Sequence, residues 1–353
     1  MSSPLVTINL VVFNGEKYLR HCLNAVKKQT YPNIEVNILN NASTDQTAEI
    51  IHEFASLNTK YKILNTKSNL GTWPGQEKAL EYSQGEYILA LSVDVLLHPE
   101  FVTEAVKVMQ NDEKIGAVQS KTYQYTLNPI LNTEYDILHT NLIDTAGFRL
   151  LRNRRLINVG HGEEDQGQYE KEEEIFGVEG AAPFFRRSAL EDCRVQGKII
   201  DKDMFWYGDD LDLAWRMHLY GWKQVYSPQV IAYHDRSTTK GMSKGWIDYL
   251  SRIKIRRQIP IKKRRWDWRN KRIARLKNDY WHNVFHDLPF ILHREFMEFV
   301  YIVLVEPAVL LEMLKFITLI PKTLRKRKAV FERVRVSPEA MRKWFMAHGT
   351  NKF

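Results

Sequence analysis

Three carboxylates lie within four positions of the chain, at Asp209, Asp210 and Asp212. They follow an aromatic run and a glycine, and apolar residues recur at helical spacing as far as Leu219, so we expect the acids at the start of an amphipathic helix. One interpretation is helix capping, since an acid near a helix N-terminus stabilises it by about 0.3–1 kcal/mol. The other is catalysis, because two carboxylates packed beside aromatic rings repel each other and one can hold a raised pKa suited to accepting a proton. We expect Asp212 to face solvent or to pair with Arg216.

The first third of the chain, which must help to position these acids, alternates predicted strands with predicted helices. The predicted strands are 5–12, 34–39, 61–64, 87–91 and 115–119, and the predicted helices are 16–28, 48–54, 76–83 and 99–110. This alternation indicates an α/β sheet with helices on both faces, in which ligands bind beyond the carboxyl ends of the strands. Asn14, Asn40 and Asp94 follow such strand ends, so we expect them at one edge of the sheet.

Two common nucleotide-binding motifs do not occur in the sequence. No Gly-x-Gly-x-x-Gly follows the first strand and there is no Gly-Lys-Ser/Thr loop, which argues against a dinucleotide oxidoreductase and a P-loop NTPase. Cys22 and Cys193 lie in apolar, helix-like contexts and are expected to be free thiols. The apolar run at residues 5–12 is too short for a secretory signal, so a cytoplasmic protein is expected.

The net charge of +9 is unevenly distributed. Residues 1–239 carry 24 basic and 32 acidic residues, whereas residues 240–353 carry 27 basic and 10 acidic residues. This asymmetry predicts a catalytic body followed by a basic tail that meets polyanions or anionic lipid.

A series of short motifs along residues 4–239 resembles, in collinear order, the family 2 glycosyltransferases, and most closely their rhamnosyltransferase-like branch. The motifs are Val12–Gly15, Gln29–Val36, Asn41–Asp45, Asn69–Gly71, Gly85–Leu89 with Asp94, Arg186–Leu190, Gly208–Arg216, Gly221–Trp222 and Tyr233–His234. The resemblance implies a GT-A fold: a Rossmann-like, mostly parallel central sheet flanked by helices. It also implies a nucleotide-diphosphate sugar donor, a Mg²⁺ or Mn²⁺ ion and inversion at the anomeric carbon.

The same resemblance implies roles for individual residues. The nucleotide-sugar site would comprise Phe13, Asn14, Asn40, Asn69, Gly71, Lys78, Ser92 and Val93. The metal ligands would be Asp94 and His234, the catalytic pair Asp210 as base with Asp209 beside it, and the acceptor site Gly180, Ala181, Trp206 and Tyr207. A helix-capping role for Asp94, an ordinary hydrogen-bonding role for His234 and simple packing of the two aromatic rings are the alternatives.

Two departures from the family pattern favour a second interpretation. Asn40 stands where the family usually has an aspartate that reads a pyrimidine base, and Ser92 replaces the first acid of an Asp-x-Asp metal motif. An amide offers both a donor and an acceptor and can still pair with a pyrimidine edge. The alternative function is therefore a catalytically inactive sugar-nucleotide-binding or scaffold protein of the same fold.

The remaining organisation is predicted from composition. We expect a catalytic domain at 1–239, with a nucleotide-binding half at about 1–121 and an acceptor half at about 122–239. The acidic stretch 163–174 is either a solvated loop or an acceptor-side flap. A basic, tryptophan-containing linker at 240–285 and an amphipathic helical tail at 286–353 follow.

The basic tail has three interpretations: a solvated linker, a nucleic-acid surface or a surface for anionic membranes. The apolar segment Phe296–Ile320 favours the membrane, and its acids exclude a simple spanning helix. It suits an interfacial helix kinked at Pro307, or else a helix that packs on the body or forms a homo-oligomer. The sequence thus predicts a peripheral enzyme on the cytoplasmic face of the plasma membrane, with no nucleic-acid partner. It would move rhamnose or another hexose to a lipid-linked or polysaccharide acceptor in cell-envelope glycan synthesis.

Overall fold

The computed structural model describes residues 3–56, 60–127, 137–236 and 256–346. The first part of the predicted basic linker, with Trp246, lies outside the described residues. Within them, ten strands form one central sheet in the order β10-β12-β6-β11-β4-β1-β2-β3, with β5 beside β12 and β7 beside β6. The strands are β1 Val6–Val12, β2 Ile34–Asn40, β3 Tyr61–Asn65, β4 Tyr87–Ser92, β5 Val95–Leu97, β6 Ile115–Leu127, β7 Ile137–Thr145, β10 Glu173–Glu174, β11 Phe184–Arg186 and β12 Lys223–His234.

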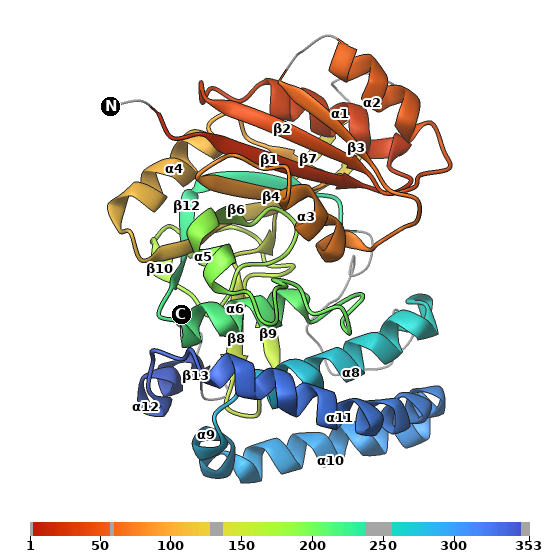
Figure 1. Cartoon of the computed structure of the whole chain (residues 1–353), viewed down its shortest axis with the longest axis vertical. Helices are drawn as coiled ribbons and strands as arrows, with labels where there is room; N and C mark the ends of the chain where they lie inside the picture. Colours follow the sequence, from red (N-terminus) through yellow and green to blue (C-terminus); the bar gives the residue numbers. More distant parts are fainter. Residues whose placement is uncertain (1–2, 57–59, 128–136, 237–255, 347–353) are drawn as a thin grey trace.

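Helices cover both faces of this sheet (Figure 1). They are α1 Glu16–Lys27, α2 Thr47–Ser56, α3 Thr72–Leu80, α4 Phe101–Asn111, α5 Arg187–Asp192 and α6 Asp209–Leu219. Strand β4 shows why both faces are covered: its alternate side chains Tyr87 and Leu89 join the core formed with α1, α2 and α4, whereas Ile88 and Ala90 join the core formed with α3, α5 and α6. A strand with apolar side chains on both faces requires a layer of helices on each side.

The predicted α/β class is confirmed, and the predicted strands correspond to β1–β4 and β6. Strands β1, β2 and β4 are parallel, with Val12 opposite Asn40 and Val11 opposite Ser92, so their carboxyl ends share one edge. The short strand β11 was not predicted, and it runs antiparallel between β4 and β6. Three residues are too few to show a period in the sequence.

Most residues from 261 to 341 form helices on the side of α6 that faces away from the sheet (Figure 1). They are α8 Ile261–Asn278, α9 Trp281–His286, α10 Leu288–Val305, η2 Pro307–Val309, α11 Leu310–Phe331 and α12 Pro338–Met341. The expected kink at Pro307 is a complete break, with a short 3₁₀ turn between two helices. Among the described residues, no helix combines the length and the apolar content needed to cross a membrane.

This helical extension is attached to the body by strand pairing and by buried ion pairs. Its last strand, β13 Phe345–Met346, pairs with β8 Phe148–Leu151, which also pairs with β9 Leu156–Asn158. Lys326 of α11 pairs with Asp201 and Asp203 of the body. The charges of the extension are therefore used largely inside the molecule.

Candidate active site

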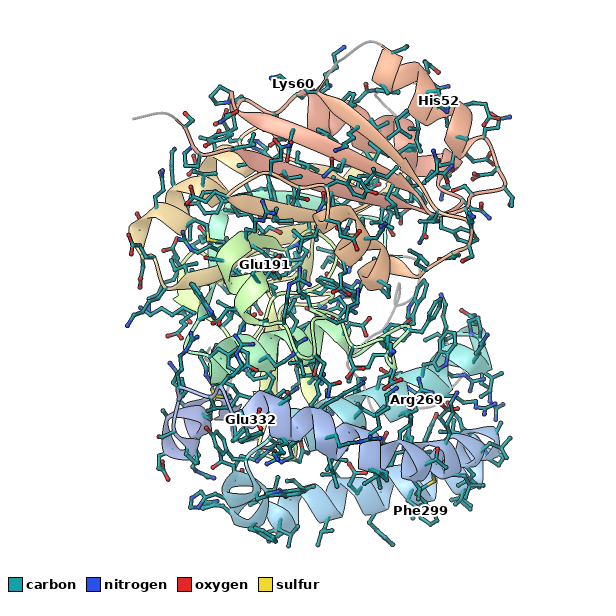
Figure 2. All side chains as sticks on the ribbon, viewed as in Figure 1. His52, Lys60, Glu191, Arg269, Phe299 and Glu332 are labelled. Carbon is teal, nitrogen blue, oxygen red and sulfur yellow. The ribbon has the colours of Figure 1, made fainter. Side chains whose placement is uncertain are left out.

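A cleft of about 410 Å³ opens at the carboxyl edge of β1 and β4, beside the start of α6. Thirteen of the sixteen predicted site residues line it: Phe13, Asn69, Gly71, Ser92, Val93, Asp94, Gly180, Ala181, Trp206, Tyr207, Asp209, Asp210 and His234. Asp94 and Asp210 thus belong to one cavity although they are far apart in the sequence. Figure 2 shows the side chains of the described residues on the same view as Figure 1.

Three predicted donor-site residues do not line the cleft. The Asn40 Oδ1 accepts a hydrogen bond from the backbone N–H of Ser43 at 3.0 Å, and the Asn14 Oδ1 accepts one from that of Thr44 at 2.8 Å. Both amides therefore shape the loop after β2. The Lys78 ammonium lies on the surface of α3, where it pairs with Glu81 at 2.5 Å.

Asn41, which the sequence did not single out, is the amide that reaches the cleft from this loop. Its Nδ2 donates to the Asn69 Oδ1 and to the carbonyl of Gly71, both at 3.1 Å, and its Oδ1 accepts from the Leu70 N–H at 2.9 Å. Gly71 has φ +90°, and an added Cβ would lie 3.1 Å from the Phe205 carbonyl oxygen. Asn41 therefore holds the turn at residues 69–71 against the cleft.

Asp94 and His234 meet because β5 pairs with the end of β12, where Val95 is opposite His234. The His234 Nε2 lies 3.4 Å from the Asp94 carboxylate, and its Nδ1 lies 2.8 Å from the Asp144 carboxylate. Burial disfavours the charged imidazolium, but hydrogen bonds with Asp144 and Asp94 raise the pKa of His234 to about 10. Burial likewise opposes ionisation of Asp94, and the contact with His234 nevertheless holds the pKa of Asp94 below its ordinary value.

Two further charges of this network were not predicted. The Arg236 guanidinium bonds both oxygens of Asp144 at 2.8 and 3.0 Å and the Glu179 carboxylate at 2.9 Å. Arg236 and Glu179 both line the cleft. The sequence offered one signal for each residue: Arg236 comes two residues after the predicted ligand His234, and Glu179 directly precedes the predicted acceptor residue Gly180.

The residues around Asp94 fit a divalent cation in part. Within the described part of the chain, no group of three or more His, Cys, Asp or Glu side chains is placed to hold a metal. Asp94 and His234 offer two ligands, a carboxylate that suits Mg²⁺ or Mn²⁺ and an imidazole that favours Mn²⁺. Asp144 fixes the Nδ1 side of His234 and so directs the Nε2 towards Asp94, as carboxylates behind metal-binding histidines do.

The acids Asp209 and Asp210 begin α6 after a turn with two left-handed residues, Tyr207 at φ +64° and Gly208 at φ +86°. Asn270 of α8 holds this turn, because its Nδ2 donates to the carbonyls of Trp206 and Tyr207 at 2.8 and 2.9 Å. The extension therefore helps to position the predicted catalytic acids.

The two acids differ from ordinary surface carboxylates. Burial and repulsion from Glu179 raise the pKa of Asp210 to about 6. Asp209 is 4% exposed, its Oδ1 has no hydrogen-bond partner among the described residues, and burial together with Asp210 raises its pKa well above the ordinary value. A carboxylate that titrates near neutral pH at the edge of a cleft is suited to accept a proton.

Asp212 does not face solvent, so that expectation was wrong, whereas its predicted pairing with Arg216 is present at 2.7 Å. It is 1% exposed and also accepts hydrogen bonds from Lys277 at 2.8 Å and Asn278 at 2.7 Å, both on α8. Burial alone would raise the pKa of Asp212, but Arg216 and Lys277 hold it below its ordinary value.

An aromatic wall closes the same end of the cleft. Trp206, Tyr207 and Phe205 line it together with Trp73 of α3. The Lys263 ammonium from α8 also lines the cleft and lies 4.1 Å from the centre of the Trp206 ring. Sequence reasoning did not single out Lys263, because one lysine among the 15 basic residues of 240–277 carries no signal of its own.

Residues 7–194, more than half of the chain, match the family described as Glycosyl transferase family 2. The chain belongs to this family. Among the relatives of this chain, the poly-beta-1,6-N-acetyl-D-glucosamine synthase of Staphylococcus epidermidis is 23% identical over 228 residues, which are 65% of this chain and 49% of that protein. The chondroitin synthase of Pasteurella multocida is 30% identical over 135 residues, which are 38% of this chain and 13% of that protein. The chain thus spans less than half the length of these curated relatives.

Two solved structures share the fold of this family 2 glycosyltransferase. The mannosyltransferase PcManGT from Pyrobaculum calidifontis, in complex with GDP-Man and Mn²⁺, has a TM-score of 0.51 at 18% identity and covers 96% of this chain and 79% of its own. The TarS fragment 1–349 from S. aureus, in complex with UDP-GlcNAc, has a TM-score of 0.52 at 16% identity and covers 97% of this chain and 92% of its own. The central sheet with its helices is accordingly the GT-A fold.

Proposed function

We propose that the chain is an inverting, metal-dependent glycosyltransferase that moves a hexose from a nucleotide-diphosphate sugar to a lipid-linked or polysaccharide acceptor in cell-envelope glycan synthesis. The observation that carries the proposal is the single cleft lined by Asp94, His234 and Asp210. Two candidate metal ligands and a carboxylate with a pKa of about 6 in one cleft suit sugar transfer that uses a cation and a general base. The motif Gly208–Arg216 supports a place in the rhamnosyltransferase-like branch, with a deoxyhexose such as rhamnose as donor sugar.

In this mechanism Asp210 accepts the proton of the acceptor hydroxyl while the hydroxyl oxygen attacks the anomeric carbon. The new glycosidic bond forms as the bond between that carbon and the diphosphate oxygen breaks, and the nucleoside diphosphate leaves with the electron pair. Asp94 and His234 would hold a Mg²⁺ or Mn²⁺ ion, which when bound neutralises charge on the departing diphosphate. Trp206 and Tyr207 supply rings against which a sugar can stack, and Asn69 and Gly71 border the donor side.

A thermal-shift panel of nucleoside diphosphates and their sugars, each with and without Mn²⁺, tests the proposal. We expect at least one sugar nucleotide to stabilise the protein more in the presence of Mn²⁺ than in its absence, because binding to the folded state raises the melting temperature. Asp94→Asn should remove the Mn²⁺-dependent part of that shift. A panel without any stabilising nucleotide would refute the proposed donor class.

The second candidate is an inactive sugar-nucleotide-binding or scaffold protein. It is supported by the two departures from the family pattern, Asn40 and Ser92. The titration of Asp210 near neutral pH favours the enzyme, since a scaffold gains nothing from an ionisable group that burial destabilises. Release of free nucleoside diphosphate from the stabilising donor, measured with Mn²⁺, separates the two. Binding with no release would favour the scaffold.

We further propose that the extension attaches the enzyme peripherally to an anionic membrane surface, at the inner face of the plasma membrane. Thirteen large apolar side chains between residues 281 and 324 are exposed: Trp281, Phe285, Phe290, Leu292, Phe296, Met297, Phe299, Val303, Leu304, Leu311, Leu314, Ile317 and Leu324. Helix α10 lies furthest from the sheet, and Phe299 is on its outer side (Figures 1 and 2). Apolar patches of this extent mark membrane or protein contacts.

The basic run 325–328, expected as a second membrane anchor, contributes only in part. Lys326 and Arg327 are buried, whereas Arg325 and Lys328 are exposed and remain available to anionic headgroups. Sedimentation with phosphatidylcholine vesicles, with and without phosphatidylglycerol, tests the attachment. The double variant Leu304→Ser, Leu314→Ser should stay in the supernatant, and sedimentation equal to wild type would refute the proposed surface.

A further inference from the structure

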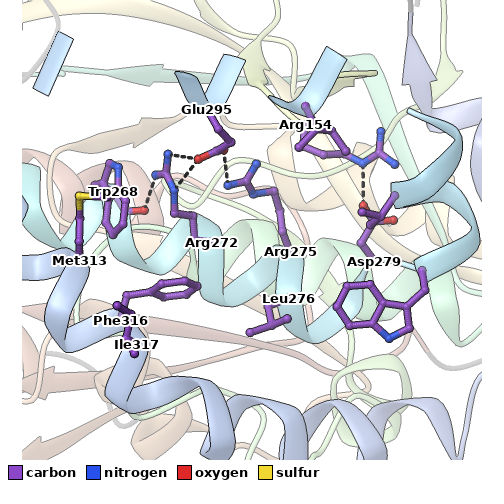
Figure 3. A pocket seen from close by; sticks show the side chains of 13 residues that line it. Arg154, Trp268, Arg272, Arg275, Leu276, Asp279, Glu295, Met313, Phe316 and Ile317 are labelled. Carbon is purple, nitrogen blue, oxygen red and sulfur yellow. Dashed lines mark hydrogen bonds and ion pairs between the residues drawn. The ribbon is translucent and has the colours of Figure 1, made fainter. Parts of the chain in front are cut away.

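A second cavity, of about 390 Å³, lies between α8, α9, α10 and α11 (Figure 3). Its apolar walls come from Trp268 and Leu276 of α8, Val284 of α9, Ile291 of α10, and Met313 and Phe316 of α11. It shares no lining residue with the catalytic cleft. Its volume falls within the ~300–1,000 Å³ that is usual for small-molecule sites. A concave, mostly apolar pocket with a few polar groups in its wall is the usual form of a ligand site.

Two residues of the cavity wall carry buried hydrogen-bond donors. The Trp268 Nε1–H and the Arg275 Nε–H have no hydrogen-bond partner among the described residues, and Trp268 is 5% exposed. A buried donor without a partner costs about 1–3 kcal/mol. Both nitrogen atoms are screened from the cavity by neighbouring atoms, so the charge of the wall, and not these donors, decides which ligand the cavity suits. The Asp279 Oδ1, which also lacks a partner, belongs to a carboxylate that pairs with Arg154 at 2.7 Å through its other oxygen.

The charge of the same wall is positive. Arg272 and Arg275 share the Glu295 carboxylate at 2.6 and 2.7 Å, as Figure 3 shows. Arg294 and Glu298 are the next charges, 3.4 Å apart, and Arg272 also reaches Glu298 at 3.1 Å. Among the lining residues, Arg154, Arg272 and Arg275 stand against Asp279 and Glu295, which leaves one positive charge for an anionic group.

The cavity is continuous with the exposed apolar surface of the extension. Ile317 lines the cavity and is 59% exposed, and Trp281 lines it and is 48% exposed. An alkyl chain can therefore enter from the surface that we assign to the membrane. We propose that this cavity binds one alkyl chain of an anionic membrane lipid, with the anionic headgroup on the side of Arg272 and Arg275. The inference deepens the proposed membrane contact, which it extends from a surface to a specific lipid site.

Equilibrium binding of 11-(dansylamino)undecanoic acid to the full chain, followed by dansyl fluorescence, tests the site. We expect one probe per chain, displaced by oleoyl lysophosphatidylglycerol and not displaced by inorganic phosphate. Val284→Trp and Met313→Trp fill the cavity from two different walls, and each should weaken probe binding by about tenfold or more. Leu314→Trp is the matched control, because Leu314 neighbours Met313 on α11, is 66% exposed and does not line the cavity.

Thermal melting of each variant shows whether it is folded, and two filling variants keep the test valid if one does not fold. Wild-type affinity in both filling variants, or an equal loss in Leu314→Trp, would overturn the proposal. Displacement by phosphate alone would show an anion site without a lipid chain and would also overturn it. The assay needs no donor and no metal, so its failure is distinguishable from failure of the nucleotide panel. Unchanged vesicle sedimentation of a variant that has lost the probe would separate the cavity from the surface.

Discussion

Helix α6 places acids in two regions of the molecule, and the pKa of a carboxylate is shifted in opposite directions in the two. At the cleft, Asp209 and Asp210 are shielded from water without an adjacent cation, and the pKa of each is raised. One turn further on, at the interface with α8, Asp212 is more deeply buried but contacts Arg216 and Lys277, and its pKa is lowered. Burial is common to both regions, and the presence of a cation decides the direction of the shift.

The comparison teaches that the two regions have separate tasks. A buried acid without a cation has a raised pKa. Its ionised form destabilises the fold, but it can accept a proton near neutral pH. An acid that is fully paired stabilises the fold and can accept no proton near neutral pH. Substitutions in the two regions should therefore affect turnover and stability in opposite proportions, and each prediction below tests that separation.

Asp210→Asn should give the largest effect. The amide keeps the shape of the side chain and removes the base, so turnover of the stabilising sugar nucleotide should fall by about 10²–10⁴-fold. Binding of the donor, measured by thermal shift, should remain. Turnover within threefold of wild type, roughly the spread of individual contributions, would remove Asp210 from the mechanism and leave Asp209 as the candidate base.

Asp212→Ala should instead destabilise the fold. The substitution leaves Arg216 and Lys277 buried without their shared carboxylate, and breaking a buried pair in this way costs about 3–5 kcal/mol. Urea denaturation measures the change in the free energy of unfolding, with Asp210→Asn as the control from the same helix. A loss of less than about 1 kcal/mol, the value of an exposed pair, would contradict the assignment of Asp212 to a buried network.

The fold could be predicted from the sequence because the patterns that indicate strands and helices are local and recur along the chain. The runs that become β1, β2 and β4 are apolar and β-branched, and their polar ends gave the correct edge of the sheet. The motif residues then located most of the cleft, since a short turn such as 69–71 can be recognised without knowledge of its partners. Strand β11 could not be found, because three residues between β4 and β6 show no period.

What the sequence could not give are the pairings between distant segments. Asp212 was expected to face solvent or to pair with Arg216, and only the packing of α6 on α8 adds the buried contact with Lys277. Asp144 on β7 lies 90 residues before His234 in the sequence, but its carboxylate contacts the imidazole at 2.8 Å and orients it. Asn40 ends β2 and Asn41 follows it, and the direction of each side chain decides which of them reaches the cleft.

Asp144→Asn tests a third acid, one that lies beside the cleft but is fully paired. Asp144 contacts His234 and Arg236, and these contacts hold its pKa below the ordinary value although burial opposes ionisation. The neutral amide should orient His234 less well and weaken Mn²⁺ binding by about 10–100-fold. Electron paramagnetic resonance of free Mn²⁺ measures that affinity directly. Binding of the nucleoside diphosphate without metal should not change, and an unchanged Mn²⁺ affinity would make Asp144 a structural residue only.

The pH dependence should separate the same two groups of acids. Turnover should rise about tenfold per pH unit below pH 6 and level off above it, because the pKa of Asp210 is about 6 and the ionised form is the base. The contribution of Asp210 to the free energy of unfolding should instead fall as the pH rises. Its folded pKa exceeds the ordinary value of 3.8, so its contribution is fully present below about pH 3.8 and is lost as the pH rises through about 6.

Asp210→Asn should therefore gain stability relative to wild type between pH 4 and 7, by about 1–3 kcal/mol. Chemical denaturation of both proteins at pH 4, 5, 6 and 7 measures the difference. A difference that is the same at every pH would show that Asp210 does not titrate in this range.

Lys263→Met should give the smallest effect and sharpens the comparison most, because Lys263 is the cation that the extension brings to the cleft. Burial lowers the pKa of its ammonium, which lies over the Trp206 ring. A cation at this distance from an aromatic face contributes about 0.5–2 kcal/mol, and it can also attract an anionic substrate group. Lys263 belongs to neither group of acids. Its loss should therefore raise the KM for donor or acceptor by about three- to tenfold and leave kcat within about twofold. The free energy of unfolding should stay nearly unchanged. Lys262→Met, on the preceding and exposed residue, is the matched control. A fall in kcat with an unchanged KM would instead place Lys263 among the groups that act in the transition state, and the extension would then take part in the chemistry as well as in binding.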